Sequence, residues 1–300
     1  MDKELARNRI ADTMEKFLRL GAVRLPDDVY KKLKECEEKE TSEMQKVLYK
    51  SYFDNLDTAF KKNRPCCQDT GLLHFYIEVG TEFPYMDILE DALREATINA
   101  TQSVPLRQNT VNYFEEKNTG NNVGERIPWI HWDIVPGGDN LEIIQYFAGG
   151  GCVLPGCAKV FKPSDGYEAI VEYVFDAVSD LGINACPPLI VGVGLGHNIE
   201  NAALLSKKAY LRPIGTSHHH ERGKELEEAL LEGLNNLGIG AQGMKGNSVA
   251  MAVNIESSAR HTATIAVAVN VACYAHRRGV IKFYKDLSYE IMNYEGADIS

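Results

Sequence analysis

The chain has 300 residues, of which 44% are hydrophobic and 25% charged, so it can bury a large core without disulfides. Its net charge is −10, from 32 Lys and Arg against 42 Asp and Glu, which argues against nucleic-acid binding because that requires clustered basic residues. The longest apolar runs, 190–195 and 265–272, are too short to cross a bilayer, and no secretory signal opens the chain. We therefore expect a cytoplasmic protein that binds neither nucleic acid nor membrane.

Helical and extended segments are mixed along the chain. In chain order, the apolar periodicity predicts helices over 2–20 and 42–62, a strand over 72–79, a helix over 86–103, strands over 129–135 and 141–147, a helix over 167–181, a strand over 189–193, helices over 200–210 and 224–237, and strands over 249–255, 265–271 and 280–284. Ser42 and Gln45 have the spacing of a capping box, and Gly238 is expected to end the last helix. We predict one compact mixed α/β (α+β) domain over 1–300, with helices packed around small sheets.

Two conspicuous patterns carry little functional weight. Gly238, Gly240 and Gly243 match the spacing of a dinucleotide fingerprint, but that motif requires a strand before it and a helix after it, and here the order is reversed. The run 218–220 contains three consecutive histidines, which do not naturally converge on one metal ion. We therefore expect neither a nucleotide site nor a metal site at these segments.

Seven cysteines, an odd number without CxxC spacing, argue against a disulfide framework or a zinc site. Cys36, in a charged helical run, is interpreted as structural. Segment 64–71 places two thiols beside an amide and a carboxylate, although the carboxylate of Asp69 could simply cap a turn. Cys186 precedes two prolines that stiffen the backbone, and Cys273 follows a predicted strand.

Thiols in rigid turns far apart in the sequence are more typical of an iron–sulfur site than of a zinc site. Three thiolates would leave one iron of a four-iron cluster open, as in catalytic metal sites, and that iron could act as a Lewis acid. The glycines of 148–152 can bring backbone N–H groups close to an anion. Packing of all these thiols in the core remains an alternative at this point.

Five motifs occur in the order found in a known enzyme family: RPCCQDTG at 64–71, PLR at 105–107, KNTG at 117–120, ACPP at 185–188 and CYAHRR at 273–278. They make the chain, from about Asp2 to its end, resemble the α subunit of class I fumarase/tartrate dehydratase. The resemblance implies an oxygen-sensitive [4Fe–4S] hydro-lyase. Segment 148–156 (AGGGCVLPG) is more similar to the tartrate-dehydrating branch than to fumarases, which implies dehydration of L(+)-tartrate to oxaloacetate.

The resemblance also implies roles for individual residues. The implied cluster ligands are Cys67, Cys186 and Cys273, with the fourth iron open. The implied catalytic residues are Asp69 and His261, and the implied substrate-binding residues are Gln68, Arg107 and Gly150. An arginine at 107 suits a dicarboxylate because its planar fork can bind a carboxylate through two hydrogen bonds. No role is implied for Cys66, Cys152, Cys157 or His218.

Fused relatives continue into a second domain that resembles a β subunit, so the resemblance implies an obligate β partner, in an α2β2 assembly. Three alternatives remain open at the level of sequence. The first is a fumarase α subunit that interconverts fumarate and malate. The second is a non-catalytic iron or redox sensor that uses the same cluster. The third is a structural subunit whose thiols are all core residues.

Overall fold

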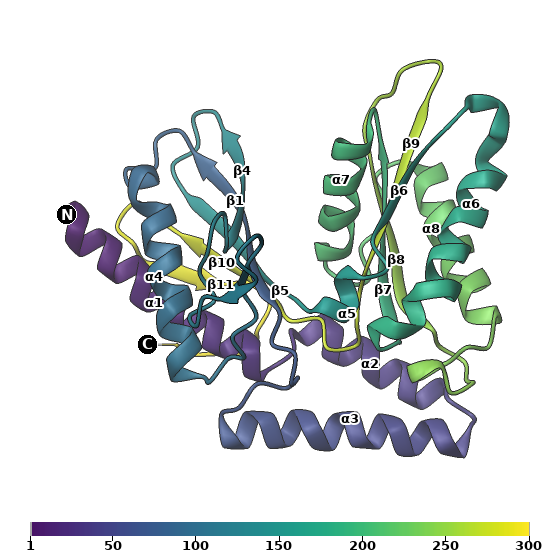
Figure 1. Cartoon of the computed structure of the whole chain (residues 1–300), viewed down its shortest axis with the longest axis horizontal. Coiled ribbons are helices and arrows are strands. Elements are labelled where there is room, and N and C mark those ends of the chain that lie inside the picture. The colour runs from purple at the N-terminus through teal and green to yellow at the C-terminus, as the bar shows by residue number, and fades with distance from the viewer. Residues whose placement is uncertain (1, 300) are drawn as a thin grey trace. The chain divides into compact units, whose positions relative to one another are not determined.

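In the computed structural model, which describes residues 2–299, contacts group the chain into two compact units (Figure 1). Unit 1 is formed by the chain up to Asp27, by Asp54–Gly149 and by the chain from Arg277 onward, and unit 2 by Asp28–Phe53 and Gly150–His276. Each unit packs helices against a small sheet, so the predicted mixed α/β class is confirmed. The single domain over 1–300 stays a prediction. No helix within residues 2–299 is long and apolar enough to cross a membrane.

Unit 1 is built on a five-stranded sheet. Its elements are α1 (Lys3–Val23), β1 (Leu72–Gly80), α4 (Leu89–Ser103), β2 (Val111–Asn112), β3 (Lys117–Asn118), β4 (Trp129–Val135), β5 (Leu141–Ala148), β10 (Arg278–Phe283) and β11 (Tyr289–Ile291). The strand order is β11–β10–β5–β1–β4, with β1 parallel to β4 and the other pairs antiparallel. The strands predicted on either side of the 136–140 turn both form, but β1 lies between them.

The core of unit 1 lies between this sheet and the two helices α1 and α4. Ile10, Met14 and Phe17 recur at helical spacing on the buried side of α1, as the sequence predicts. They pack in one cluster with Phe75 of β1 and Leu93 of α4. Burial of this stripe explains why α1 is helical although its other side is polar.

Unit 2 contains a four-stranded sheet in the order β6–β9–β7–β8. Its elements are α2 (Asp27–Lys39), α5 (Gly150–Val153), β6 (Cys157–Phe161), α6 (Gly166–Asp176), β7 (Leu189–Gly196), α7 (Ile199–Leu211), α8 (Glu221–Asn236), β8 (Ala250–Ser257) and β9 (Ile265–Ala272), and α3 (Glu43–Lys62) is divided between the two units. β7 runs parallel to β8 and antiparallel to β9, and β6 pairs antiparallel with β9. α7 covers one face of the sheet, whereas α6 and α8 cover the other (Figure 1).

Side chains alternate between the two faces of β7. Val191 and Val193 belong to the cluster that includes Leu230 of α8. On the other face, Gly192 and Gly194 have no side chain, so the backbone of α7 approaches the strand directly. A Cβ at either glycine would overlap backbone atoms of α7. These glycines therefore serve helix packing.

Three local expectations differ in detail from the structure. The helix predicted over 167–181 is α-helical only to Asp176 and continues as a π-helical turn over Ala177–Leu181. The capping box at Ser42 does not form: the Ser42 N–H donates to Glu40 Oε1 at 2.9 Å, and the buried side chain of Gln45 donates from Nε2 to the Ala241 carbonyl at 3.0 Å. Gly238 does take a left-handed conformation (φ 66°). α8 precedes this segment and β8 follows it, which is the order of elements that the sequence indicates.

Substitution of Gly194 by Ala tests the close packing of α7. The new Cβ would overlap the Ala202 carbonyl oxygen and lie 2.5 Å from the Ser206 nitrogen, so the helix must move. We expect the free energy of unfolding to fall by about 3 kcal/mol, measured by urea denaturation followed by circular dichroism. Gly120→Ala is the control, because its Cβ meets nothing and only its positive φ costs about 1 kcal/mol. Equal losses in the two variants would contradict this explanation.

Candidate functional site

The adjacent thiols Cys66 and Cys67 differ in environment. Cys66 is only 3% exposed, and its backbone N–H donates to the Ala22 carbonyl at 3.0 Å. Its carbonyl accepts a hydrogen bond from Asn55 Nδ2 at 2.7 Å. Cys67 is partly exposed. Of the two thiols, Cys67 is therefore the one available at the surface of unit 1, whereas Cys66 anchors the turn in the core.

Asp69 shapes the turn that leads into β1. Its Oδ1 accepts hydrogen bonds from the Gly71 N–H at 3.0 Å and from Asn109 Nδ2 at 3.1 Å. Arg277, which is 2% exposed, donates from Nη2 to the Asp69 carbonyl at 2.9 Å and from Nη1 to the Thr70 carbonyl at 3.3 Å. The carboxylate does cap the turn, and the same bonds fix its orientation. Sequence reasoning did not assign this supporting role to Asn109 or Arg277.

Arg107 lies beside this turn in unit 1. Its Nη1 donates to Gln68 Oε1 at 3.3 Å, and its carbonyl accepts from Asn122 Nδ2 at 3.0 Å. The Thr70 hydroxyl donates to the same carbonyl at 3.4 Å. The guanidinium and Gln68 are both exposed. The structure thus brings three of the predicted site residues together, Gln68, Asp69 and Arg107, with a cation at the surface that can bind a carboxylate.

In unit 2, Cys186 and Cys273 lie at the same end of the sheet. Cys186 precedes β7 with a left-handed backbone (φ 56°), and Cys273 directly follows β9. Because β7 and β9 are antiparallel, with Ile190 opposite Ala272, the start of one strand meets the end of the other. The Tyr274 N–H donates to the Cys186 carbonyl at 3.3 Å.

A pair of tyrosines supports this end of the sheet. The rings of Tyr52 and Tyr274 are stacked, with centroids 3.8 Å apart and planes 13° apart. The Tyr52 hydroxyl donates to the Pro187 carbonyl at 3.2 Å and accepts from Gln242 Nε2 at 2.8 Å. Burial raises the pKa of Tyr52, and the electrostatic effect of the nearby Cys186 and Cys273 raises it further, whereas the Gln242 bond opposes the shift. Sequence reasoning missed this support.

The glycine segment 149–151 follows β5. In unit 1, a Cβ at Gly149 would lie 3.2 Å from Asp69 Oδ2. In unit 2, Gly150 begins α5, and a Cβ at Gly151 would lie 3.1 Å from the Asn184 carbonyl oxygen, two residues before Cys186. Such close packing leaves little room for a side chain at either glycine. It also places Gly150, the predicted substrate-binding residue of this segment, between two tightly packed neighbours.

His261 lies at the opposite end of the unit 2 sheet from the two cysteines. It precedes β9, whereas Cys273 follows it, and an eight-residue strand spans roughly 26 Å. The His261 side chain is exposed, and its Nδ1 accepts the Ala263 N–H at 3.1 Å, so in the neutral ring Nε2 carries the proton. Within unit 2, the structure therefore does not bring His261 together with Cys186 or Cys273.

The remaining thiols are distributed through both units. No disulfide joins any of the seven cysteines, all of which the structure describes. Burial raises the pKa of the Cys36 thiol in α2, which agrees with a structural role. Cys152 is buried in α5 near Lys207. Burial lowers the pKa of Lys207, and the electrostatic effect of Cys152 opposes this shift. Within residues 2–299, no three His, Cys, Asp or Glu side chains are placed to hold a metal ion by themselves, so the histidine run forms no such group.

The Tyr52 pKa predicts a pH effect on stability. An unfolded tyrosine ionises near pH 10, but the raised pKa keeps the folded Tyr52 neutral, so its contribution to stability is present below pH 10 and is lost as the pH rises above it. In an absorbance titration at 295 nm, Tyr52→Phe should leave the first tyrosine transition unchanged and remove signal only from the unfolding transition. Tyr113→Phe, at an 89% exposed side chain, should reduce the first transition. Loss of early signal in Tyr52→Phe would contradict the assignment.

Comparison with known proteins shows which family the chain belongs to. The family model described as fumarate hydratase (Fumerase) matches residues 11–282. The chain is 50% identical over 293 residues to the L(+)-tartrate dehydratase subunit alpha of Escherichia coli strain UTI89, covering 98% of this chain and 97% of that protein. Identity is 49% over the same coverage for the subunit of strain K12, and 36% over 281 residues (93% and 99%) for a putative L(+)-tartrate dehydratase subunit alpha of Methanocaldococcus jannaschii. The chain belongs to the fumarate hydratase (Fumerase) family.

Proposed function

We propose that this chain is the α subunit of a hydro-lyase that dehydrates L(+)-tartrate to oxaloacetate. The observation that carries the proposal is the identity of about half of all residues, over nearly the full length of both chains, to proteins named as tartrate dehydratase α subunits. In the reaction, hydroxide leaves one carbon and a proton leaves its neighbour, which gives water and an enol that tautomerises to oxaloacetate. Hydration of fumarate remains the second candidate, because the matching family model carries that description.

The donor chemistry of this chain is compatible with an iron–sulfur cluster. Thiolates are the usual ligands of such clusters, and the two unit 2 cysteines share one end of a sheet. We propose that Cys67, Cys186 and Cys273 hold a [4Fe–4S] cluster with one open iron. When bound, the cluster would supply a Lewis acid for the leaving hydroxyl. The stacked pair Tyr52 and Tyr274 would keep the backbone beside two of these ligands rigid.

The residues of unit 1 would bind and orient the substrate. The exposed Arg107 guanidinium can bind one carboxylate with two hydrogen bonds, and Gln68 holds the guanidinium through Oε1. Asp69 is held by Gly71 and Asn109 at Oδ1, so its carboxylate is oriented before substrate arrives. We propose that Asp69 assists the departure of the substrate hydroxyl by transferring a proton to it. Backbone N–H groups near Gly150 would bind the second carboxylate.

His261 requires a different explanation, because an eight-residue strand separates it from Cys273. Its imidazole cannot span roughly 26 Å within unit 2. The loop that carries it is held by Arg260 Nη1, which donates to the carbonyls of His261 at 3.0 Å and Thr262 at 3.3 Å. We therefore propose that His261 donates its Nε2 proton in the site of a neighbouring α chain.

The proposal includes a partner subunit. The relatives are named as α subunits, which implies a further chain. We propose a β subunit that removes the substrate proton, in an α2β2 assembly. We also propose a cytoplasmic location, supported by the absence of disulfides among the seven cysteines. The small dicarboxylate is the only further ligand that the proposed reaction needs.

The cluster and the substrate can be tested together. The chain, co-purified anaerobically with its partner subunit, should contain about four iron and four sulfide per chain and should form oxaloacetate from L(+)-tartrate. Cys67→Ser, Cys186→Ser and Cys273→Ser should each lose the cluster absorbance and the activity, whereas Cys36→Ser should retain both. Activity on malate alone would favour the fumarate hydratase alternative. A cluster with no hydro-lyase activity would favour the sensor, and no iron after reconstitution would favour the structural subunit.

Mixed assemblies can test which α chain supplies His261 to each site. An α chain with His261→Asn should be inactive by itself, as should one with Cys273→Ser. If His261 acts between α chains, hybrids carrying one copy of each, isolated by two affinity tags, should regain about half of the wild-type activity, because one site then has all three cysteines and an intact histidine. Thr262→Ala is the control and should leave activity unchanged. Inactive hybrids would overturn the proposal that the histidine is shared.

A further inference from the structure

A second concave site lies in unit 2, at the end of the sheet away from Cys186 and Cys273. It has a volume of about 890 Å³, within the range of small-molecule sites. Its walls come from the last residues of β7 and β8, the first residue of β9, the first turns of α6 and α8, and the histidine run 218–220. The apolar part of the lining includes Ile170, Leu195, Leu226, Ile255 and Ile265.

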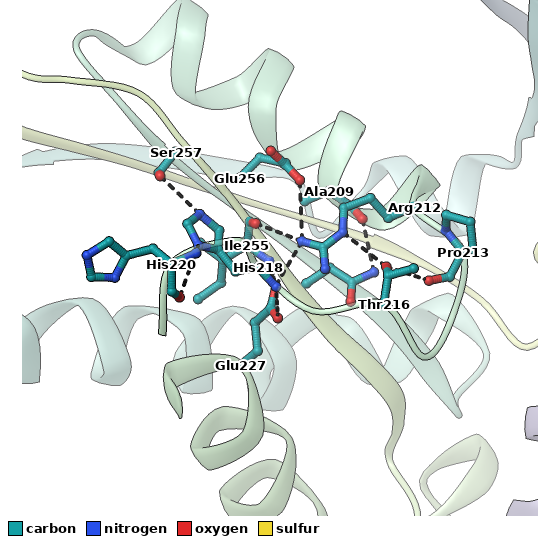
Figure 2. Close-up of polar contacts among 11 residues, drawn as sticks. Ala209, Arg212, Pro213, Thr216, His218, His220, Glu227, Ile255, Glu256 and Ser257 are labelled. Carbon is teal, nitrogen blue, oxygen red and sulfur yellow. Dashed lines mark hydrogen bonds and ion pairs between the residues drawn. The ribbon is translucent and has the colours of Figure 1, made fainter. Parts of the chain in front are cut away.

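A buried ion pair fixes one wall of this cavity (Figure 2). Glu227 is 5% exposed, and its Oε1 accepts from Arg212 Nη1 at 2.9 Å and from the Ile255 N–H at 2.7 Å. Its Oε2 accepts from the His218 N–H at 2.8 Å. Arg212 Nη1 also donates to the Ile255 carbonyl at 3.0 Å. The loop before α8 is thereby attached to β8, and the buried carboxylate is neutralised.

The ring of His218 is held between His220 and Ser257. Its Nδ1 accepts the His220 N–H at 3.0 Å and lies 3.4 Å from the His220 carbonyl oxygen; with the shorter bond made, the neutral ring carries its proton on Nε2. Nε2 lies 3.1 Å from the Ser257 hydroxyl oxygen and donates to it (Figure 2). In this tautomer His218 does not take the Ser257 proton as a general base would, so it does not activate a serine nucleophile. Instead, the Ser257 O–H can donate to a ligand in the cavity.

The polar rim carries more positive than negative charge. Arg222 and Arg260 line the cavity, with Glu225 as the one carboxylate of its lining, although the chain as a whole has a net charge of −10. Arg260 is oriented by its Nη1, which binds carbonyls of its own loop. Its guanidinium has further N–H groups beyond Nη1, and a carboxylate is their natural acceptor.

We propose that this cavity binds a small carboxylic acid with a hydrocarbon body. The carboxylate accepts hydrogen bonds from the Ser257 hydroxyl and the Arg260 guanidinium, and the hydrocarbon body covers Ile255 and Leu226. A dihydroxy dicarboxylate such as tartrate does not fit this description, because it has no hydrocarbon body to cover the apolar wall. The site differs from the proposed hydro-lyase site in its residues and in the ligand it would take, although Arg260 precedes His261, which we propose acts in the hydro-lyase site of a neighbouring α chain.

Isothermal titration calorimetry with 4-phenylbutanoate, and with 4-phenylbutanol as the uncharged counterpart, tests the proposal on the purified protein. The wild-type chain should bind the acid at least tenfold more tightly than the alcohol. Arg260→Gln should lower the affinity for the acid about tenfold and leave that for the alcohol unchanged. Arg126→Gln, at an exposed arginine in unit 1, is the control and should bind both probes as the wild type does.

A second variant fills the cavity without removing a charge. Ala229 lines the cavity on the exposed side of α8, so Ala229→Trp should keep the fold, checked by circular dichroism, and abolish binding of both probes. No binding to the wild type at 10 mM would overturn the proposal, as would equal affinities for acid and alcohol. Unchanged acid binding in Ala229→Trp would place the probe elsewhere and would also overturn it.

Discussion

The close approach of α7 to β7 is the constraint on which unit 2 depends. Gly192 and Gly194 let the helix backbone rest on the strand, and a single Cβ at either would force them apart. The opposite face of the same strand presents Val191 and Val193 to α6 and α8. Because β7 is packed tightly on both faces, it is held rigidly, and the residues at its two ends are held in place with it.

The two ends of that strand carry different chemistry. One end holds the thiols of Cys186 and Cys273 near the stacked rings of Tyr52 and Tyr274. The other end holds a cavity with an apolar wall, a serine hydroxyl in contact with His218, and two arginines on its lining. The length of β9 keeps them apart, so residues that the sequence places only twelve positions apart, such as His261 and Cys273, cannot act on one small molecule within this unit.

Unit 1 shows how a turn can be structural and functional together. Asp69 caps the entry to β1, which is the plain interpretation of the sequence, and the same bonds orient its carboxylate, while Arg107 donates to the side chain of the preceding residue, Gln68. Arg277 supports this turn from the far end of the chain, through two backbone carbonyls. Carbonyls in a turn lack the hydrogen-bond donors that a helix or sheet would provide, and the buried Arg277 guanidinium supplies them here. No local sequence pattern indicates this role.

The sequence by itself determined the class of fold, the order and type of the long elements, and the family, because apolar periodicity and the motifs around Cys67, Cys186 and Cys273 are local properties of the chain. Only the tertiary structure decided which of Cys66 and Cys67 is buried, that β1 separates β4 from β5, and that His261 lies a strand away from Cys273. The capping box at Ser42 does not form because Glu40 accepts the Ser42 N–H, and the Gln45 side chain donates to the distant Ala241 carbonyl. Strand order, burial and long-range hydrogen bonds depend on segments far apart in the sequence, and periodicity within one segment carries no information about them.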